Sequence, residues 1–244
     1  VITSLGQGGA ERTLFNYLSN VSNAHQHQVL CLSKGGIFIE RLEKLGVNVF
    51  VLDLKSSPFV SIKHLLCMIR FNLRSTEVIL GWMYHGNIVS VLIRLLLFRK
   101  SKMIWNIRHS VSSLKKEKRS LRIAIRISAY LSFFADTIIY NSKIARVQHE
   151  NLGFKSTNSI YIPNGVDTDY WGYSIQNRID RLANFGINRI SFAYVGRRHQ
   201  MKNQRNLVLA INEMASRNTG LTFHLIGREL HNFSGLLDPN LTER

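Results

Sequence analysis

Short apolar runs alternate with amphipathic stretches along most of this sequence, and this alternation limits the folds open to the chain. The runs lie at 29–32, 49–54, 77–83, 102–109, 136–142 and 159–165. They are rich in β-branched and aromatic residues, which is typical of strands in a parallel sheet that helices cover on both faces. Between the runs, Ser142 can cap the start of a helix over 142–151 and Gly153 can end it. We therefore predict an α/β fold built from repeated strand–helix units.

The alternation stops after Gly165 and resumes near the end of the chain. There we expect a strand, a helix and a strand at 189–196, 203–218 and 221–227. The predicted organisation is a Rossmann-like domain over 1–168 with its first strand trimmed, a linker over 169–188, and the beginning of a second α/β domain over 189–244. Two strands and one helix are too few for a doubly wound sheet. We therefore expect the sequence to be cut at both ends.

The charge balance predicts an anionic partner. The 244 residues include 32 Lys and Arg against 15 Asp and Glu, a net charge of +17. Nucleic acid, a phosphorylated ligand and an acidic membrane surface would all suit such a chain. The excess is local, because residues 94–126 hold eleven basic residues and one acid, Glu117. The eleven are Arg94, Arg99, Lys100, Lys102, Arg108, Lys115, Lys116, Lys118, Arg119, Arg122 and Arg126.

Cysteine usage and hydropathy bear on the compartment. The sequence has 2 cysteines, Cys31 and Cys67, too few for a disulfide framework and wrongly spaced for a zinc site. Arg94 and Arg122 interrupt long apolar runs, so no run approaches the roughly 18 residues of a spanning helix. We expect a cytoplasmic protein.

A glycine turn near the start of the chain is a candidate phosphate site. Gly8 and Gly9 follow a predicted strand and open a predicted helix, which directs backbone N–H groups and the positive end of the helix dipole at a ligand. The dinucleotide fingerprint is excluded, because Glu11 stands where its third glycine belongs. A tight turn without a ligand is the alternative.

Basic residues flank a second strand-to-helix turn, in VGRRHQMKN (195–203). Arg197 and Lys202 could converge on a diphosphate there and stabilise the charge that grows on it as a bond to it breaks. Solvated loop charge is the alternative.

Two histidines follow predicted strands. His109 ends IWNIRH at the carboxyl edge, where open α/β sheets bind ligands, and His85 in WMYHGN repeats the arrangement one strand earlier. Packing or capping roles are the alternatives for both.

An Asp-x-Asp pair, Asp167 and Asp169, is a candidate for a divalent cation. It follows the PNG turn at 163–165, at the predicted domain boundary rather than in a loop that lines a site. We predict no metal site and no cofactor.

Four stretches, in order, resemble one family. They are GGAER (8–12), IRHS (107–110), IPNGVDTDYW (162–171) and VGRRHQMKN (195–203), and they are similar to the GT4-type retaining glycosyltransferases of the GT-B fold. WMYHGN and IYNSKIARVQHENLGF resemble a bacterial branch that builds cell-surface polysaccharides such as O-antigen. The resemblance implies two Rossmann-like domains that face each other across a cleft. The nucleotide-sugar donor would be held mostly by the C-terminal domain and the acceptor mostly by the N-terminal one.

The resemblance also implies roles for individual residues. Gly8 and Gly9 match the loop near the donor pyrophosphate. His109 matches the histidine near the transferred sugar, and Arg197 and Lys202 match the basic pair that stabilises the departing diphosphate. These three would be the catalytic residues. Enzymes of this kind need no metal, and the nucleotide-sugar is their substrate rather than a cofactor.

The function implied is sugar transfer to a polysaccharide or lipid-linked acceptor with retention of configuration. Glu11 and His85 would lie on the acceptor side. The basic segment would hold the protein on an anionic membrane surface, peripherally at the inner face of the cytoplasmic membrane, and no nucleic-acid partner is expected. The family's Glu-x7-Glu motif is not reached before Arg244, so we expect residues 1–244 alone to have little or no activity.

Two other functions stay open on the sequence. One is a non-catalytic α/β domain that binds nucleic acid, although aromatic residues are not interleaved with the basic segment as stacking platforms. The other is a nucleotide-sugar epimerase of the same fold.

Overall fold

The structure is a computed structural model, and it describes residues 1–53, 57–71, 76–96, 101–169, 190–196, 202–217 and 221–227. The chain divides into two compact units, Val1–Val166 and Asp167–Arg244. The linker predicted over 169–188 lies outside the described residues except for Asp169. The predicted domain limits therefore stay predictions.

The first unit contains each of the six strands that the sequence predicts. They are β1 (Gln28–Cys31), β2 (Asn48–Val51), β3 (Val78–Trp82), β4 (Lys102–Ile107), β5 (Thr137–Tyr140) and β6 (Ser159–Tyr161). The helices are α1 (Gly9–Ser19), α2 (Phe38–Glu43), α3 (Pro58–Phe71), α4 (Met83–Leu96), α5 (Arg119–Leu131) and α6 (Lys143–Asn151). Short 3₁₀ turns lie at Ala24–Gln26, Leu114–Lys116 and Ser132–Phe134. The caps predicted for α6 are confirmed, because Ser142 Oγ accepts from the Ala145 N–H at 3.5 Å and Gly153 follows the helix with φ +91°.

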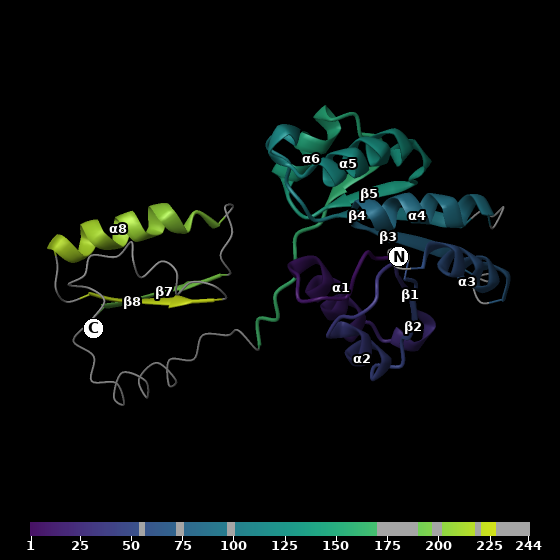
Figure 1. The fold of residues 1–244 in the computed structure, drawn as a ribbon, viewed down its shortest axis with the longest axis horizontal. Helices are drawn as coiled ribbons and strands as arrows, with labels where there is room; N and C mark the ends of the chain where they lie inside the picture. The colour runs from purple at the N-terminus through teal and green to yellow at the C-terminus, as the bar shows by residue number, and fades with distance from the viewer. Residues whose placement is uncertain are drawn as a thin grey trace. The chain divides into compact units, whose positions relative to one another are not determined.

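All strand pairs of this unit are parallel, and the first residues of the chain join them into one sheet. β1 pairs with β2, and β3, β4, β5 and β6 pair in that order. Ile2 forms parallel bridges to both Cys31 and Trp82, so it lies between β1 and β3. The ladder includes Ile2 N–H to Leu30 O at 2.9 Å and Trp82 N–H to Val1 O at 2.9 Å. The predicted opening strand is thus present as one residue, Ile2, with a bridge on each side. Figure 1 shows the N-terminus beside β1 and β3.

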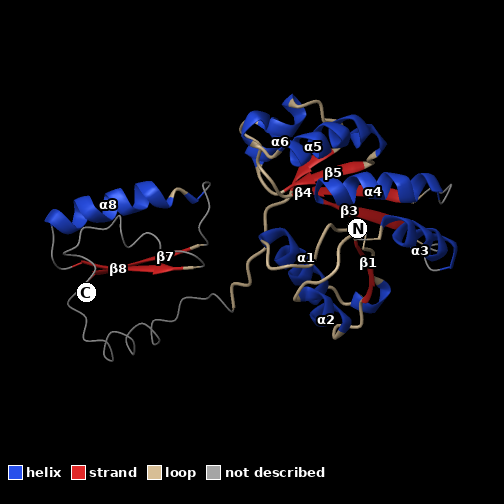
Figure 2. Cartoon of the chain, in the orientation of Figure 1, coloured by secondary structure: helices blue, strands red, loops and turns tan. Residues whose placement is uncertain are grey.

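Helices cover both faces of this sheet, as the predicted parallel arrangement requires (Figure 2). On one face, Leu14 and Leu18 of α1 and Phe38 and Leu42 of α2 pack with Cys31 of β1. The neighbouring residue of β1, Leu30, points the other way and packs with residues of α3 and α4. A third cluster joins α4, α5 and α6 to β4 and β5, with Trp105 fully buried in it.

The direction in which the chain winds changes between Ile2 and β3. From Ile2 it proceeds through α1 and α2 to one edge of the sheet, and then α3 carries it back to the other side of Ile2. Open α/β sheets bind ligands at such a switch point, outside the carboxyl ends of the strands. The loop after Ile2 and the start of α4 border this point.

β3 and α4 meet without a loop. The strand ends at Trp82, and Met83, the first residue of the helix, has φ +63°. Left-handed backbone is costly for a residue with a side chain and persists where neighbours hold it. Here the buried Asn87 amide, oriented by its hydrogen bonds, donates to Gly81 O at 3.0 Å and to Met83 O at 3.2 Å. These bonds fix the elbow between strand and helix.

The described part of the second unit is a parallel strand–helix–strand. β7 (Ile190–Val195) pairs in parallel with β8 (Leu221–Ile226), and α8 (Gln204–Arg217) connects them and buries Val208 and Ile211. The three elements predicted after residue 189 are confirmed.

Gly86 of α4 offers a test of the packing of the first residues of the chain. A Cβ at this position would lie 2.4 Å from Val1 O, which accepts from Trp82 N–H in the sheet. Gly86→Ala should therefore lower the free energy of unfolding by about 1–3 kcal/mol, the usual cost of overpacking. Gly9→Ala is the control, because a Cβ on this helical glycine meets no atom of the described residues within 4 Å. The control should be neutral or stabilising by up to about 1 kcal/mol. Urea unfolding measures both, and equal effects would contradict the close contact.

Candidate functional site

The glycine loop after Ile2 is shaped around a carboxylate. Ser4 Oγ donates to Glu11 Oε1 at 2.9 Å, and a Cβ on Gly8 would lie 2.1 Å from Glu11 Oε2. Gly8 is the N-cap of α1, so the carboxylate folds back over the positive end of the helix. Gly8 therefore makes room for Glu11, whereas Gly9 is exposed and open. Of the two glycines predicted to bind phosphate, only Gly8 is required by the packing of the described residues.

Trp82 brings this loop together with the end of β4. Its indole Nε1–H donates to Ala10 O at 3.1 Å, which ties β3 to the first turn of α1. The Arg108 guanidinium carbon lies 5.2 Å from the centroid of the same indole. The first turn of α1 and the residue that precedes His109 thus contact the same buried side chain.

Arg108 links two of the stretches that carry the family resemblance. Nη1 donates to Asn106 Oδ1 at 2.9 Å, and Nη2 donates to Asn164 Oδ1 in IPNG. Its buried Nε–H has no partner among the described residues, and burial lowers the pKa of the guanidinium. An arginine stays protonated in proteins nonetheless. Sequence reasoning missed Arg108 as a site residue and counted it only in the basic segment, although its place one residue before His109 was a usable signal.

His109 is held from both sides of its ring. Nδ1 lies 3.2 Å from the Tyr84 hydroxyl, and Nε2 lies 3.6 Å from Glu117 Oε1. The side chain is 17% exposed, so it remains accessible from the edge of the sheet. Glu117 is the one acid of the basic segment, and that isolation was a signal the sequence offered.

Behind His109 lies a buried aromatic cluster that sequence reasoning missed. The Tyr84 hydroxyl also lies 2.7 Å from His149 Nε2, and His149 Nδ1 lies 2.7 Å from Ala145 O. The rings of Tyr84 and His149 stack with centroids 5.8 Å apart, and Phe154 meets His149 edge-on. Burial lowers the pKa of His149 to about 4, so this histidine is neutral at neutral pH. Its position on α6 gave no sign of this contact with α4.

The other predicted histidine is placed differently. His85 lies in the first turn of α4 and is exposed. The two strand-end histidines thus reach the same edge of the sheet, but only His109 has partners that the structure identifies.

The predicted phosphate residues of the second unit are described in part. Arg197 lies outside the described residues. Lys202 is exposed and lies two residues before α8, and its carbonyl accepts from the Tyr194 hydroxyl of β7 at 3.5 Å. Gln204 Nε2 donates to the same hydroxyl at 3.0 Å. The convergence of Arg197 and Lys202 on one phosphate stays a prediction.

The Asp-x-Asp pair makes a local turn, since Asp169 N–H donates to Asp167 Oδ1 at 3.1 Å. Across the described ranges, no group of three or more His, Cys, Asp and Glu side chains is placed to hold a metal ion.

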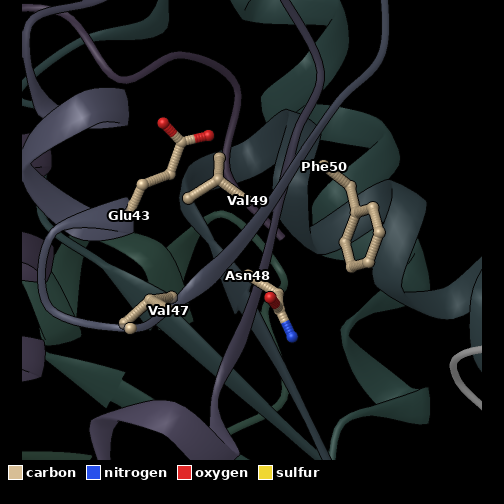
Figure 3. Close-up of a pocket in the computed structure, with 6 residues that line it drawn as sticks. Glu43, Val47, Asn48, Val49 and Phe50 are labelled. Carbon is tan, nitrogen blue, oxygen red and sulfur yellow. The ribbon is translucent and has the colours of Figure 1, made fainter.

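A depression of about 260 Å³ lies elsewhere, beside the edge strand β2 (Figure 3). It is lined by Glu43, Gly46, Val47, Asn48, Val49 and Phe50. Glu43 ends α2, Gly46 and Val47 lie in the connection, and the other three belong to β2 from its amino end, whereas ligand sites of open sheets form at carboxyl ends. We do not assign the site to it.

Solved structures with a similar fold include glycosyltransferases and a protein solved with UDP ligands. HepE of Anabaena in complex with UDP-glucose is 17% identical with a TM-score of 0.71, and the match covers 99% of this chain and 64% of that one. A glycosyltransferase of Rickettsia africae is 13% identical with a TM-score of 0.60, covering 98% of this chain and 70% of that one. The lipopolysaccharide outer core galactosyltransferase WaaB is 13% identical with a TM-score of 0.57, covering 96% of this chain and 69% of that one. This chain therefore spans about two thirds of the length of these proteins, and the predicted GT-B type α/β fold is confirmed.

A search of curated protein sequences finds no significant match. A comparison with the sequence profiles of protein families does identify a family. Residues 7–170 match the sequence profile of Glycosyltransferase Family 4. That range begins at the glycine loop and includes the start of α4, His109 and IPNG. The chain belongs to Glycosyltransferase Family 4.

Proposed function

We propose that this protein transfers a sugar from a nucleoside-diphosphate sugar to a polysaccharide or lipid-linked acceptor, with retention of configuration and without a metal ion. In this reaction the bond between the anomeric carbon and the β-phosphate oxygen breaks. An acceptor hydroxyl forms the new bond on the same face of the sugar, and its proton passes to the departing diphosphate. The product of such transfer would serve the synthesis of cell-surface polysaccharide.

The observation that carries this proposal is the arrangement at the switch point of the first unit. The glycine loop, the start of α4 and the end of β4 meet there through Trp82, which contacts both Ala10 and Arg108. The site presents a cation, a partly exposed imidazole and a carboxylate, from Arg108, His109 and Glu11. These groups suit a ligand that has phosphates and hydroxyls. HepE, a structural neighbour, has been solved with UDP and with UDP-glucose, which supports a uridine nucleotide as the first donor to test.

The chemistry requires positive charge where the diphosphate departs. In the second unit Lys202 follows β7 in the chain and precedes α8, and the Tyr194 hydroxyl of β7 donates to Lys202 O. A lysine in this place can stabilise the negative charge that develops in the transition state. We assign this role to Lys202 together with Arg197.

The first test is the loss of that charge. In the full-length protein, Lys202→Ala should lower turnover about a hundredfold or more, the scale observed when one donor to a developing oxyanion is removed. Arg205→Ala is the matched control, because Arg205 is an exposed residue of α8 and its loss removes the same charge. Release of nucleoside diphosphate from a panel of nucleotide-sugars, with and without EDTA, provides the measurement. Near-normal turnover of Lys202→Ala would refute the role, and abolition of turnover by EDTA would refute metal independence.

We further propose that the first unit docks on an anionic membrane surface, which would supply a lipid-linked acceptor. Support comes from α5, whose outer side is both apolar and basic. Ile125 of this helix is buried, but Ile123, Ile127 and Tyr130 are exposed, the last at 79%. Exposed Arg119 and Arg126 accompany them, with Arg122 half-buried beside them. Within the described residues no helix is long and apolar enough to cross a membrane.

Liposome flotation tests this docking. Arg122→Glu combined with Arg126→Glu should weaken binding to vesicles with anionic lipid about thirtyfold or more, since each basic residue near such a surface contributes about 1 kcal/mol. The control is Arg12→Glu with Lys44→Glu, the same charge change at exposed positions of α1 and at the end of α2. The control should bind like the unmodified protein. Equal flotation with neutral and anionic vesicles would sink the proposal.

A further inference from the structure

We propose that Tyr84 and His149 are positioning residues that hold His109 in its Nδ1–H tautomer, so that Nε2, beside Glu117, is its one reactive nitrogen. The four groups form a chain in which each distance is known. Ala145 O, His149, Tyr84 and His109 follow one another at 2.7, 2.7 and 3.2 Å. Tyr84 and His149 are both buried, so neither is open to a ligand at the edge of the sheet.

The positions of the protons in this series of hydrogen bonds follow from its first group, which can only accept. Ala145 O is a backbone carbonyl and can only accept, so His149 Nδ1 carries a proton and donates it. A neutral imidazole then has a lone pair on Nε2. Burial lowers the pKa of His149 to about 4, which keeps the ring neutral at neutral pH.

The state of His149 then determines the direction in which the Tyr84 hydroxyl donates. Since His149 Nε2 accepts, the Tyr84 O–H donates to it, at 2.7 Å. The tyrosine has one proton, and burial raises the pKa of Tyr84 well above its ordinary value, so the phenol keeps it. Tyr84 therefore offers only a lone pair to His109. Nδ1 of His109, 3.2 Å away, must be the donor.

The opposite order of protons is less favourable. If Nε2–H of His109 donated to Glu117, Tyr84 would donate to His109 Nδ1, and His149 would need protons on both nitrogens to keep both of its hydrogen bonds. That ring would then carry a charge with 0% of its surface exposed. The gain would be small, because His109 Nε2 lies 3.6 Å from Glu117 Oε1, beyond hydrogen-bond distance.

As a consequence, Nδ1 of His109 always donates to Tyr84, whereas Nε2 can gain or lose a proton. In both charge states Nδ1–H bonds Tyr84. Nε2 either offers a lone pair to a hydroxyl of a bound sugar or, once protonated, donates while Glu117 balances the charge. The use of Nε2 in sugar transfer rests on the function proposed above, whereas the tautomer does not.

Long-range ¹H–¹⁵N correlation spectra of the histidine side chains test the tautomer directly. In mildly alkaline buffer, His109 and His149 should both show the Nδ1–H pattern, with the His109 signals assigned by their loss in His109→Gln. An Nε2–H pattern for His109 in the unmodified protein would overturn the inference. This measurement needs neither a substrate nor a variant that removes a positioning residue.

Tyr84→Phe supplies the second arm. His109 should change to the Nε2–H tautomer, because Glu117 then offers the nearest acceptor, while His149 keeps Nδ1–H. Tyr140→Phe is the matched control, since the Tyr140 ring lies 5.4 Å from His149 and its buried hydroxyl has no partner in the described part of the chain. The control should leave both tautomers unchanged. An unaltered His109 pattern in folded Tyr84→Phe would contradict the inference.

Turnover separates this inference from the proposed function. In the full-length protein, Tyr84→Phe should lower kcat for sugar transfer about tenfold or more with little change in KM for the donor, as expected when a catalytic imidazole is held in the wrong form. Tyr140→Phe should retain kcat. If the tautomers are as expected but His109→Gln transfers sugar normally, the proposed role of His109 fails and the positioning of its ring stands.

Discussion

The first unit depends on a strand and a helix that meet without a loop. β3 ends at Trp82 and α4 begins at Met83 with φ +63°. Residues that are close in sequence at this turn therefore contact different parts of the unit. Trp82 faces α1 and Arg108, Tyr84 turns into the core, and Gly86 lies against Val1. The backbone strain of such a turn costs of order 1–3 kcal/mol. Asn87 offsets part of it with two bonds to the elbow.

This geometry explains why WMYHGN holds both structural and site residues. A conventional loop would place Trp82 and Tyr84 independently of each other. Here the same rigid turn aims one side chain at the glycine loop and another at the buried histidine of α6. The position of His109 relative to Gly8 is therefore set by the contacts of one short segment, and a shift of that segment would move both sides of the candidate site together.

The fold was largely predictable, because the period and composition of the segments reflect burial directly. All six strands of the first unit, the caps of α6 and the three elements after residue 189 lie where the sequence indicates. The site was predictable only where a residue follows a strand, as His109 does. His149 was missed because the signal that identifies it is a contact between α4 and α6. The end of α4 and the start of α6 are 47 positions apart in the sequence, so no local pattern could indicate this contact. Glu11 illustrates a related limit, since its place in the motif did not indicate that its carboxylate would fold over Gly8.

The carboxylate of Glu11 also bears on how a diphosphate would be held. A phosphate drawn to the first turn of α1 meets the helix dipole, worth about 0.3–1 kcal/mol to an anion, but also a negative charge already placed there. Hydrogen bonds to charged groups contribute about 1.5–3 kcal/mol each, so a single arginine or lysine outweighs the end of the helix. Arg108 is such a group in the first unit, and Lys202 is one in the second. The site that we propose thus relies on cationic side chains for charge and on the two glycines for space. Because the Glu11 carboxylate already covers the N-terminus of α1, the residues before this helix do not need to bind phosphate themselves.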